Sequence, residues 1–119
     1  MERVLVADDE KGIVQFVGEA LRRKGYSVHV ASNGAEAFEM AKLHRPHLVL
    51  LDIRMPGMDG LEALRRIKSV DPIIRVIVIT AVHDREIIDA AYSMGASRYM
   101  TKPFELDSLA EAMEEALKQ

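Results

Sequence analysis

Short apolar runs that alternate with helix-like stretches are the feature that most constrains how this chain can fold. Five runs rich in β-branched or aliphatic residues recur along the 119 residues, at 4–7, 28–31, 48–51, 76–79 and 98–101. The first, third and fourth runs are apolar at every position, which is typical of parallel strands covered on both faces. We therefore expect these three inside a parallel sheet and the two weaker runs at its edges.

The stretches between the runs carry apolar residues at helical spacing, as in Val14, Val17 and Leu21. The other stripes are Phe38 and Ala41; Leu61, Leu64 and Ile67; Ile87, Ala90, Ala91 and Met94; and Leu106, Leu109, Met113 and Leu117. Glycines follow several stripes and Asn or Asp precedes others, as expected at helix ends. The alternation predicts an α/β fold, a doubly wound parallel sheet with five helices on both faces. Without an internal linker, one domain is expected over residues 1–119.

Composition narrows the class of partner. The chain is 49% hydrophobic and 29% charged, as ordinary globular domains are. Its net charge of −3 gives no support for attraction to nucleic acid, whose binders usually carry a basic face. No apolar stretch is long enough to span a bilayer, and no signal peptide follows Met1. Cysteine is absent, which excludes disulfides and thiolate metal sites and fits a reducing cytoplasm. We expect a cytoplasmic protein whose partners are proteins or a small ion, with no direct contact to nucleic acid or membrane.

Polar residues follow four of the five predicted strands. Asp8 and Asp9 end the first, Asp52 ends the third, Thr80 ends the fourth, and Lys102 follows the fifth. Open parallel sheets bind ligands outside the carboxyl ends of their strands. If the first and third strands are neighbours, three carboxylates converge there and repel one another unless a cation neutralises them. Mg²⁺ fits this oxygen set best, and no EF-hand spacing favours Ca²⁺.

Each of these residues alone has an ordinary structural interpretation. Asp8 or Asp9 could cap a helix, Asp52 could form a turn, Thr80 could cap the helix after it, and Lys102 could be a solvated lysine. Structural caps, however, have no reason to supply both a cation site and an anion clamp at one edge of a sheet. The combination therefore favours a phosphoryl or metal site.

Four segments in this order resemble the response-regulator receiver domain of two-component signalling. They are Ala7-Asp8-Asp9-Glu10, the stretch from Leu50 to Gly60 with the pattern D-x-x-M-P-x-M-D-G, Ile79-Thr80-Ala81, and Thr101-Lys102-Pro103-Phe104. The resemblance covers essentially the whole chain and is closest to single-domain regulators of the sporulation-phosphorelay or chemotaxis type. It implies a flavodoxin-like sheet of strand order 2-1-3-4-5.

The resemblance also implies the chemistry of the site. Asp52 would accept a phosphoryl group from the phosphohistidine of a sensor histidine kinase or histidine phosphotransferase. Mg²⁺ would be held by Asp8, Asp9, Asp52 and the backbone carbonyl of Arg54, while Lys102 would pair with the phosphoryl oxygens. Such a chain is a signalling phospho-acceptor that assists its own phosphorylation and slow dephosphorylation, not an enzyme acting on other substrates. Its output would be a downstream protein target or phosphotransferase.

Two further residues are implied as the switch. The hydroxyl of Thr80 would hydrogen-bond the phosphoryl group, and Tyr99 would turn inward as Thr80 moves; alternatively, Tyr99 is a half-buried strand aromatic without special role. The resemblance implies a cis bond between Lys102 and Pro103, against the ordinary alternative of a trans proline at the start of the last helix.

Two expectations come from residues beside the site. Ile13 and Phe16 add apolar surface to a helix that already has a buried stripe, so we expect them to dock a phosphotransferase, or else to widen the core face. Arg54 could cover the phosphorylated aspartate, and Val82 offers no group to orient water, which predicts slow dephosphorylation unless Arg54 points into solvent.

Three rival functions remain open. A Mg²⁺-dependent small-molecule phosphatase would normally carry a second acid two residues after Asp52, where this chain has Arg54. A phosphorylation-independent interaction module would tolerate loss of an acid or of the lysine, yet these positions are filled. The chain could also be the receiver domain of a longer DNA-binding regulator.

Overall fold

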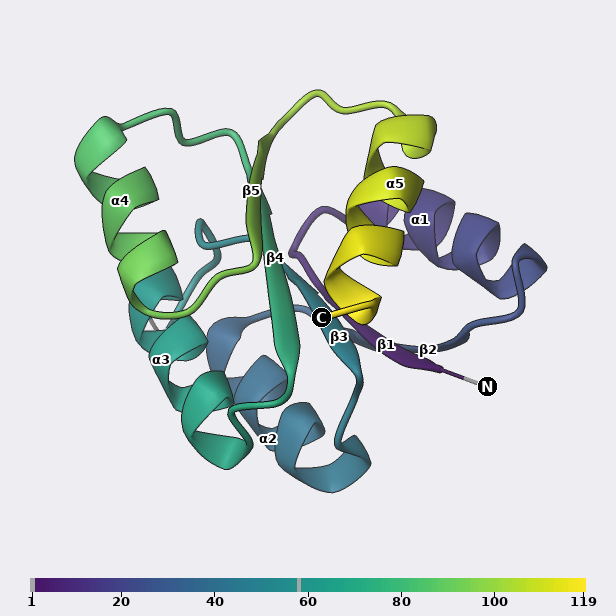
Figure 1. The fold of residues 1–119 in the computed structure, drawn as a ribbon, viewed down its shortest axis with the longest axis horizontal. Coiled ribbons are helices and arrows are strands. Elements are labelled where there is room, and N and C mark those ends of the chain that lie inside the picture. The colour runs from purple at the N-terminus through teal and green to yellow at the C-terminus, as the bar shows by residue number, and fades with distance from the viewer. Residues whose placement is uncertain (1, 58) are drawn as a thin grey trace.

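The computed structural model describes residues 2–57 and 59–119 and has a central five-stranded sheet between two layers of helices (Figure 1). The strands are β1 (Arg3–Ala7), β2 (Ser27–Ala31), β3 (Leu48–Leu51), β4 (Arg75–Thr80) and β5 (Arg98–Thr101). The helices are α1 (Lys11–Arg23), α2 (Gly34–His44), α3 (Gly60–Val70), α4 (Arg85–Ser93) and α5 (Leu106–Leu117).

All the strand pairs are parallel, in the order β2-β1-β3-β4-β5. The expected fold is confirmed, with the two weaker runs at the edges and the three continuously apolar runs inside. In β3, Leu48 and Leu50 face one helical layer while Val49 and Leu51 face the other, so every side chain of the strand is buried. The unbroken apolar pattern follows from this two-sided cover.

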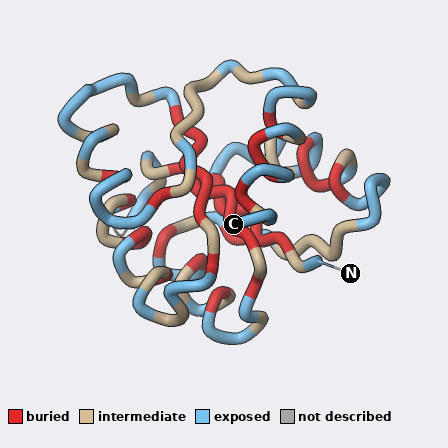
Figure 2. Tube along the Cα trace, in the orientation of Figure 1, coloured by how far each residue is buried: buried red, intermediate tan, exposed pale blue. Residues whose placement is uncertain are grey.

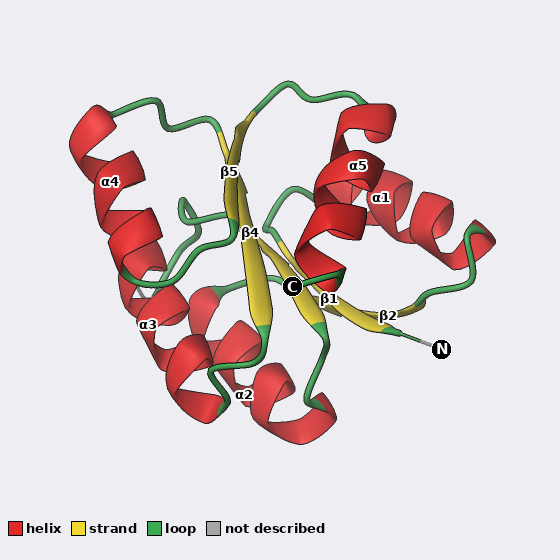
Figure 3. Cartoon of the chain, in the orientation of Figure 1, coloured by secondary structure: helices red, strands yellow, loops and turns green. Residues whose placement is uncertain are grey.

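The helices divide between the two faces of the sheet (Figure 3). One face packs against α1 and α5, chiefly through Val17, Leu21, Leu109 and Met113. The opposite face packs against α2, α3 and α4, with α4 beside β5. The buried residues concentrate in the strands and on the inward faces of the helices (Figure 2). This cover leaves the carboxyl ends of the strands accessible.

Two of the predicted apolar stripes need correction. In α2 the buried residues are Gly34, Ala37 and Ala41, whereas Phe38 is only half-buried, with the ammonium of Lys42 4.6 Å from the centre of its ring. The fully buried positions of α2 hold glycine and alanine, and the larger ring of Phe38 stays partly exposed. Met94, expected on the buried stripe of α4, is exposed because it follows the last turn of the helix.

The boundaries of the helices follow local sequence signals. Asn33, Asp59 and Asp84 each accept hydrogen bonds from backbone N–H groups in the first turn of the following helix. At the end of α2, Arg45 adopts the left-handed conformation, with φ of 45°, at a position where glycine is usual. Among the described residues, no helix has the length and apolar character that crossing a membrane requires.

Candidate functional site

Backbone hydrogen bonds just past the strand ends bring the chemistry-bearing residues together. The N–H of Asp52 donates to the carbonyl of Ala7 at the end of β1, over 2.9 Å, and the N–H of Lys102 donates to the carbonyl of Thr80 at the end of β4, also over 2.9 Å. Asp8 is held in the same way by the carbonyl of Ala31 in β2. The sheet thus extends by one residue at these points and directs Asp8, Asp52 and Lys102 to one edge.

Asp52 is almost fully buried, with 4% of its surface exposed, and both of its carboxylate oxygens are bonded. Oδ1 accepts from the backbone N–H of Arg54 over 2.7 Å, and Oδ2 accepts from the ammonium of Lys102 over 2.8 Å. The bond to Arg54 is the turn-forming contact expected of an aspartate after a strand. The contact with Lys102 is not needed for a turn, and it links the ends of β3 and β5.

Lys102 lies at the centre of a group of carboxylates. Its Nζ is 2.8 Å from Oδ2 of Asp8, 2.8 Å from Oδ2 of Asp52 and 2.6 Å from Oε1 of Glu10. Burial acts to lower the pKa of Lys102, but its hydrogen bonds to Asp52, Asp8 and Glu10 outweigh burial and raise that pKa. The lysine is therefore cationic at any physiological pH.

Asp8 is held by the ammonium of Lys102 and by the backbone of Glu10. Burial raises the pKa of Asp8, although hydrogen bonds from Lys102 and from the backbone N–H of Glu10 oppose the shift. The N–H of Glu10 reaches Oδ1 of Asp8 over 2.9 Å. Neither Asp8 nor Asp9 caps α1, because the cap position is Glu10 and its side chain makes no capping bond. The capping interpretation of these acids is not supported.

The oxygens present fit a hard divalent cation. Carboxylate oxygens of Asp8, Glu10 and Asp52 all lie within 4.8 Å of one another. Such a cluster of oxygen donors is the chemistry that Mg²⁺ prefers. The single positive charge of the Lys102 ammonium offsets only part of the charge of these three carboxylates. Asp9 is exposed and lies outside this group, so its role as a metal ligand stays a prediction.

Thr80 ends β4, and Tyr99 lies in β5, the neighbouring strand. Thr80 is fully buried at the end of β4, and its hydroxyl accepts a long 3.4 Å bond from the N–H of Val82. The phenolic O–H of Tyr99, in β5, donates to the carbonyl of Val82 over 2.8 Å. Burial, then the charges of Asp52 and Asp84, raise the pKa of Tyr99. Both residues thus contact the segment between β4 and α4 through Val82.

Glycine at position 60 allows the start of α3 to approach Ile53 closely. A Cβ built on Gly60 would meet the backbone and Cβ of Ile53, directly after Asp52, well inside the 3.0 Å that real Cβ atoms essentially never cross. The preceding Asp59 caps α3 through the N–H of Leu61 over 2.8 Å. The Asp59-Gly60 pair therefore starts the helix and lets its first turn pack directly against Ile53, the residue after Asp52.

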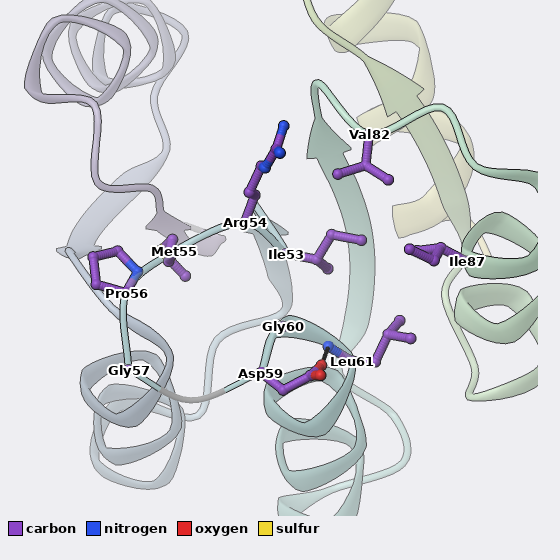
Figure 4. Close-up of a pocket in the computed structure, with 10 residues that line it drawn as sticks. All are labelled: Ile53, Arg54, Met55, Pro56, Gly57, Asp59, Gly60, Leu61, Val82 and Ile87. Carbon is purple, nitrogen blue, oxygen red and sulfur yellow. Dashed lines mark hydrogen bonds between the residues drawn. The ribbon is translucent and has the colours of Figure 1, made fainter.

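A hollow of about 480 Å³ lies between this loop and the start of α4 (Figure 4). Its lining includes Arg54, Val82, Ile53, Leu61 and Ile87. In Figure 4 the side chain of Arg54 extends away from Asp59 and Gly60, on the side of the loop where Val82 lies. Arg54 is exposed, which favours the alternative that its side chain points into solvent.

An apolar groove of about 490 Å³ borders the carboxylates on the other side. It is lined by Ile13 and Phe16 of α1, by Pro103 and Phe104 after β5, and by Glu10, Ala81 and Lys102. Phe16 is 58% exposed, so it is not part of a wider core face, whereas Ile13 is half-buried against the core. The Lys102-Pro103 bond is cis, as the resemblance implied.

Sequence reasoning missed Glu10 as a member of the charged cluster. Its carboxylate meets Lys102, ninety-two positions along the chain, and no local pattern carries that information. The acid directly after the Asp8-Asp9 pair was the one available signal. Asp52, Asp8, Lys102 and Thr80 were placed correctly at the carboxyl edge.

Comparison with known proteins gives a consistent result. The family model of the response regulator receiver domain matches residues 4–114. Sporulation initiation phosphotransferase F of Bacillus subtilis is 39% identical over 116 residues, which cover 98% of this chain and 94% of that protein. Chemotaxis protein CheY of the same species is 37% identical over 97% of each chain.

The fold is also found among solved structures. A CheY-like receiver domain protein from Methanospirillum hungatei superposes with a TM-score of 0.96 at 28% identity, covering 99% of this chain and 94% of that one. Because the superposition covers 99% of this chain, it includes the strand ends that carry Asp8, Asp52 and Lys102.

Proposed function

The chain belongs to the response regulator receiver domain family and acts as a phospho-accepting response regulator, and from that premise we propose that Asp52 is the acceptor. The observation that carries the proposal is the buried Asp52 carboxylate held between the N–H of Arg54 and the ammonium of Lys102. A carboxylate anchored on both sides has a defined orientation, which in-line transfer requires.

The transfer proceeds from a phosphohistidine. An oxygen of Asp52 forms the new bond to phosphorus, the bond from phosphorus to the histidine nitrogen breaks, and the nitrogen keeps the electron pair. Lys102, whose ammonium lies 2.8 Å from Asp52, pairs with an oxygen of the transferring phosphoryl group. The hydroxyl of Thr80 donates to another oxygen of the product.

A divalent cation completes the charge balance. Asp8 and Asp52 would hold Mg²⁺, with Asp9 and the carbonyl of Arg54 as the further ligands that the family resemblance implies. When bound, the ion neutralises phosphoryl oxygens that would otherwise be repelled by these carboxylates. The raised pKa of Asp8 reflects the burial that makes such a cation favourable.

Acetyl phosphate with Mg²⁺ provides the test. We expect the chain to gain one phosphoryl group by intact mass, and Asp52→Asn to gain none. Asp89→Asn is the matched control, since Asp89 is an exposed aspartate on α4, remote from the site. A gain that persists in Asp52→Asn, or that appears equally with EDTA, would contradict the assignment.

The donor is proposed to dock on the groove beside the site. Ile13 and Phe16 offer an exposed apolar surface next to Lys102 and Glu10, suited to the helical hairpin of a histidine kinase or phosphotransferase. Phe16→Glu should slow transfer from a phosphohistidine protein and leave acetyl phosphate labelling intact. Leu43→Glu, at an exposed leucine on α2, serves as the control. Equal loss with both donors would refute docking at this surface.

Phosphorylation is proposed to act on partners through Thr80 and Tyr99. Both residues are bonded to Val82, so a movement of Thr80 toward the phosphoryl group alters the backbone that Tyr99 holds. We also propose that phosphate is lost slowly, because Arg54 and Val82, which line the hollow between the β3–α3 loop and α4, offer no carboxylate or amide to orient water. Arg54→Asn should then lose phosphate faster than the parent chain.

A further inference from the structure

None of the steps proposed for phosphoryl transfer uses Glu10, yet its carboxylate makes the shortest contact of the charged cluster. Its Oε1 lies 2.6 Å from Nζ of Lys102, against 2.8 Å for both Asp8 and Asp52. Glu10 is the residue before α1, and its side chain takes no part in capping that helix. Its carboxylate is therefore committed to Lys102 rather than to local structure.

The ammonium of Lys102 has no donor to spare. An ammonium group carries three N–H bonds, and Lys102 faces three carboxylates at hydrogen-bond distance. A phosphoryl oxygen can bind Lys102 only after one of these contacts opens. The contact that breaks most easily decides how readily the lysine becomes available to a phosphoryl oxygen.

Glu10 is the contact that opens with least cost. The side chains of Asp8 and Asp52 are 6% and 5% exposed, whereas the side chain of Glu10 is 57% exposed and can return to water. Asp52 is also the proposed acceptor, and Asp8 is needed to hold the cation beside it. An exposed ion pair is weak, so this contact is easily exchanged for a phosphoryl oxygen.

Glu10 also lies on the side of Lys102 from which a phosphoryl donor would approach. Glu10 lines the groove together with Ile13, Phe16 and Pro103, on the side of Lys102 that borders solvent. A phosphoryl donor carries negative charge, and a carboxylate at this rim both repels it and competes with it for Lys102.

We propose that Glu10 is a positioning residue that occupies Lys102 at rest and must release it before the phosphoryl group can bind, so that Glu10 restrains phosphorylation of Asp52. This inference rests on the proposed function of Asp52. It assigns to Glu10 a regulatory effect opposite in sign to that of Lys102, although the two side chains are in contact.

The test measures the first-order rate of phosphorylation by acetyl phosphate at saturating Mg²⁺ for the parent chain and Glu10→Gln. In this reaction the bond from phosphorus to the acetate oxygen breaks, acetate leaves with the electron pair, and the new bond forms to an oxygen of Asp52. We expect Glu10→Gln to react roughly two- to fivefold faster, the range that an exposed ion pair corresponds to. A rate gain is a result that structural damage does not produce.

A matched variant separates the ion pair from general charge. Glu105→Gln removes one carboxylate from an exposed glutamate near Phe104 that likewise makes no capping bond to its helix. We expect Glu105→Gln to react at the parent rate. An equal gain in both variants would show that overall charge, not release of Lys102, sets the rate and would overturn the proposal.

The Mg²⁺ dissociation constant, measured by calorimetry without any donor, gives a second readout. We expect Glu10→Gln to bind Mg²⁺ within about twofold of the parent chain. A tenfold or larger loss would make Glu10 a metal ligand and overturn the proposal, as would an unchanged or slower phosphorylation rate. If the parent chain itself took no phosphoryl group at Asp52, the proposed function would fail; if only the Glu10 effect were absent, this inference alone would fail.

Discussion

Removal of the Lys102 ammonium should destabilise the protein strongly near neutral pH. In Lys102→Met, the carboxylates of Asp8 and Asp52 remain buried at the same edge without the cation that lies 2.8 Å from each. Loss of one partner from a buried ion pair costs about 3–5 kcal/mol. We expect about 3 kcal/mol, the lower end of that range, because Asp8 can take up a proton.

The pH dependence of this loss has a defined sign. Burial already raises the pKa of Asp8 above its usual 3.8, so the folded state takes up a proton before the unfolded state does. The stability of Lys102→Met should therefore increase as pH falls from neutral through the folded pKa of Asp8. At the other extreme, the raised pKa of Lys102 means that its contribution in the parent chain is present below 10.5 and is lost only as pH rises through the folded value.

Urea unfolding followed by circular dichroism, with EDTA and then with Mg²⁺, measures these effects. Mg²⁺ should stabilise Lys102→Met more than the parent chain, because in the parent the ammonium competes for the same carboxylates. Lys118→Met, at an exposed lysine after α5, should change stability by less than about 0.5 kcal/mol. A Lys102→Met variant within about 1 kcal/mol of the parent in EDTA, or a deficit that neither Mg²⁺ nor acid reduces, would refute the reasoning.

Three further predictions concern other parts of the molecule. Arg45→Gly should raise the free energy of unfolding by about 0.5–1 kcal/mol in urea, because Arg45 is held at φ of 45°; a loss of stability would contradict this. Burial, then the charges of His44 and of nearby arginines, lower the pKa of His29, so the free energy of unfolding should fall as pH decreases through 6.5. In urea titrations at pH 7.5 and 5.5, His29→Asn should reduce the difference in stability between the two pH values. An unchanged difference in His29→Asn would contradict this prediction. Thr80→Val should change stability by less than about 1 kcal/mol, because the buried hydroxyl makes only a 3.4 Å hydrogen bond. The same variant should abolish the phosphorylation-dependent change in the NMR signals of Tyr99. If that change were preserved, Thr80 would not be part of the switch.

The response to phosphorylation and the resting stability thus depend on overlapping residues. Lys102 neutralises the buried carboxylates at rest and, in the proposed function, pairs with the phosphoryl group of the product, so its contacts must exchange.

The sequence alone determined the elements and the edge that carries the site. Apolar runs at every position can be satisfied only by strands covered on both faces, and the period of 3.6 defines the helices, so both follow from local pattern. Because parallel strands end at one edge, the pattern of residues was enough to predict that Asp8, Asp52 and Lys102 lie there. The strand order came from family resemblance, since periodicity does not say which strands pair.

Only the tertiary structure decided which neighbouring side chains meet. Sequence reasoning grouped Asp9 with Asp8 and Asp52, yet the backbone turn after β1 leaves Asp9 exposed and brings Glu10 to Lys102. Phe38 and Ala41 were both expected inside, but only Ala41 is buried, together with Gly34 and Ala37. Such outcomes depend on contacts between residues far apart in the chain, and on distances of a few ångströms that a local pattern of residue types does not encode.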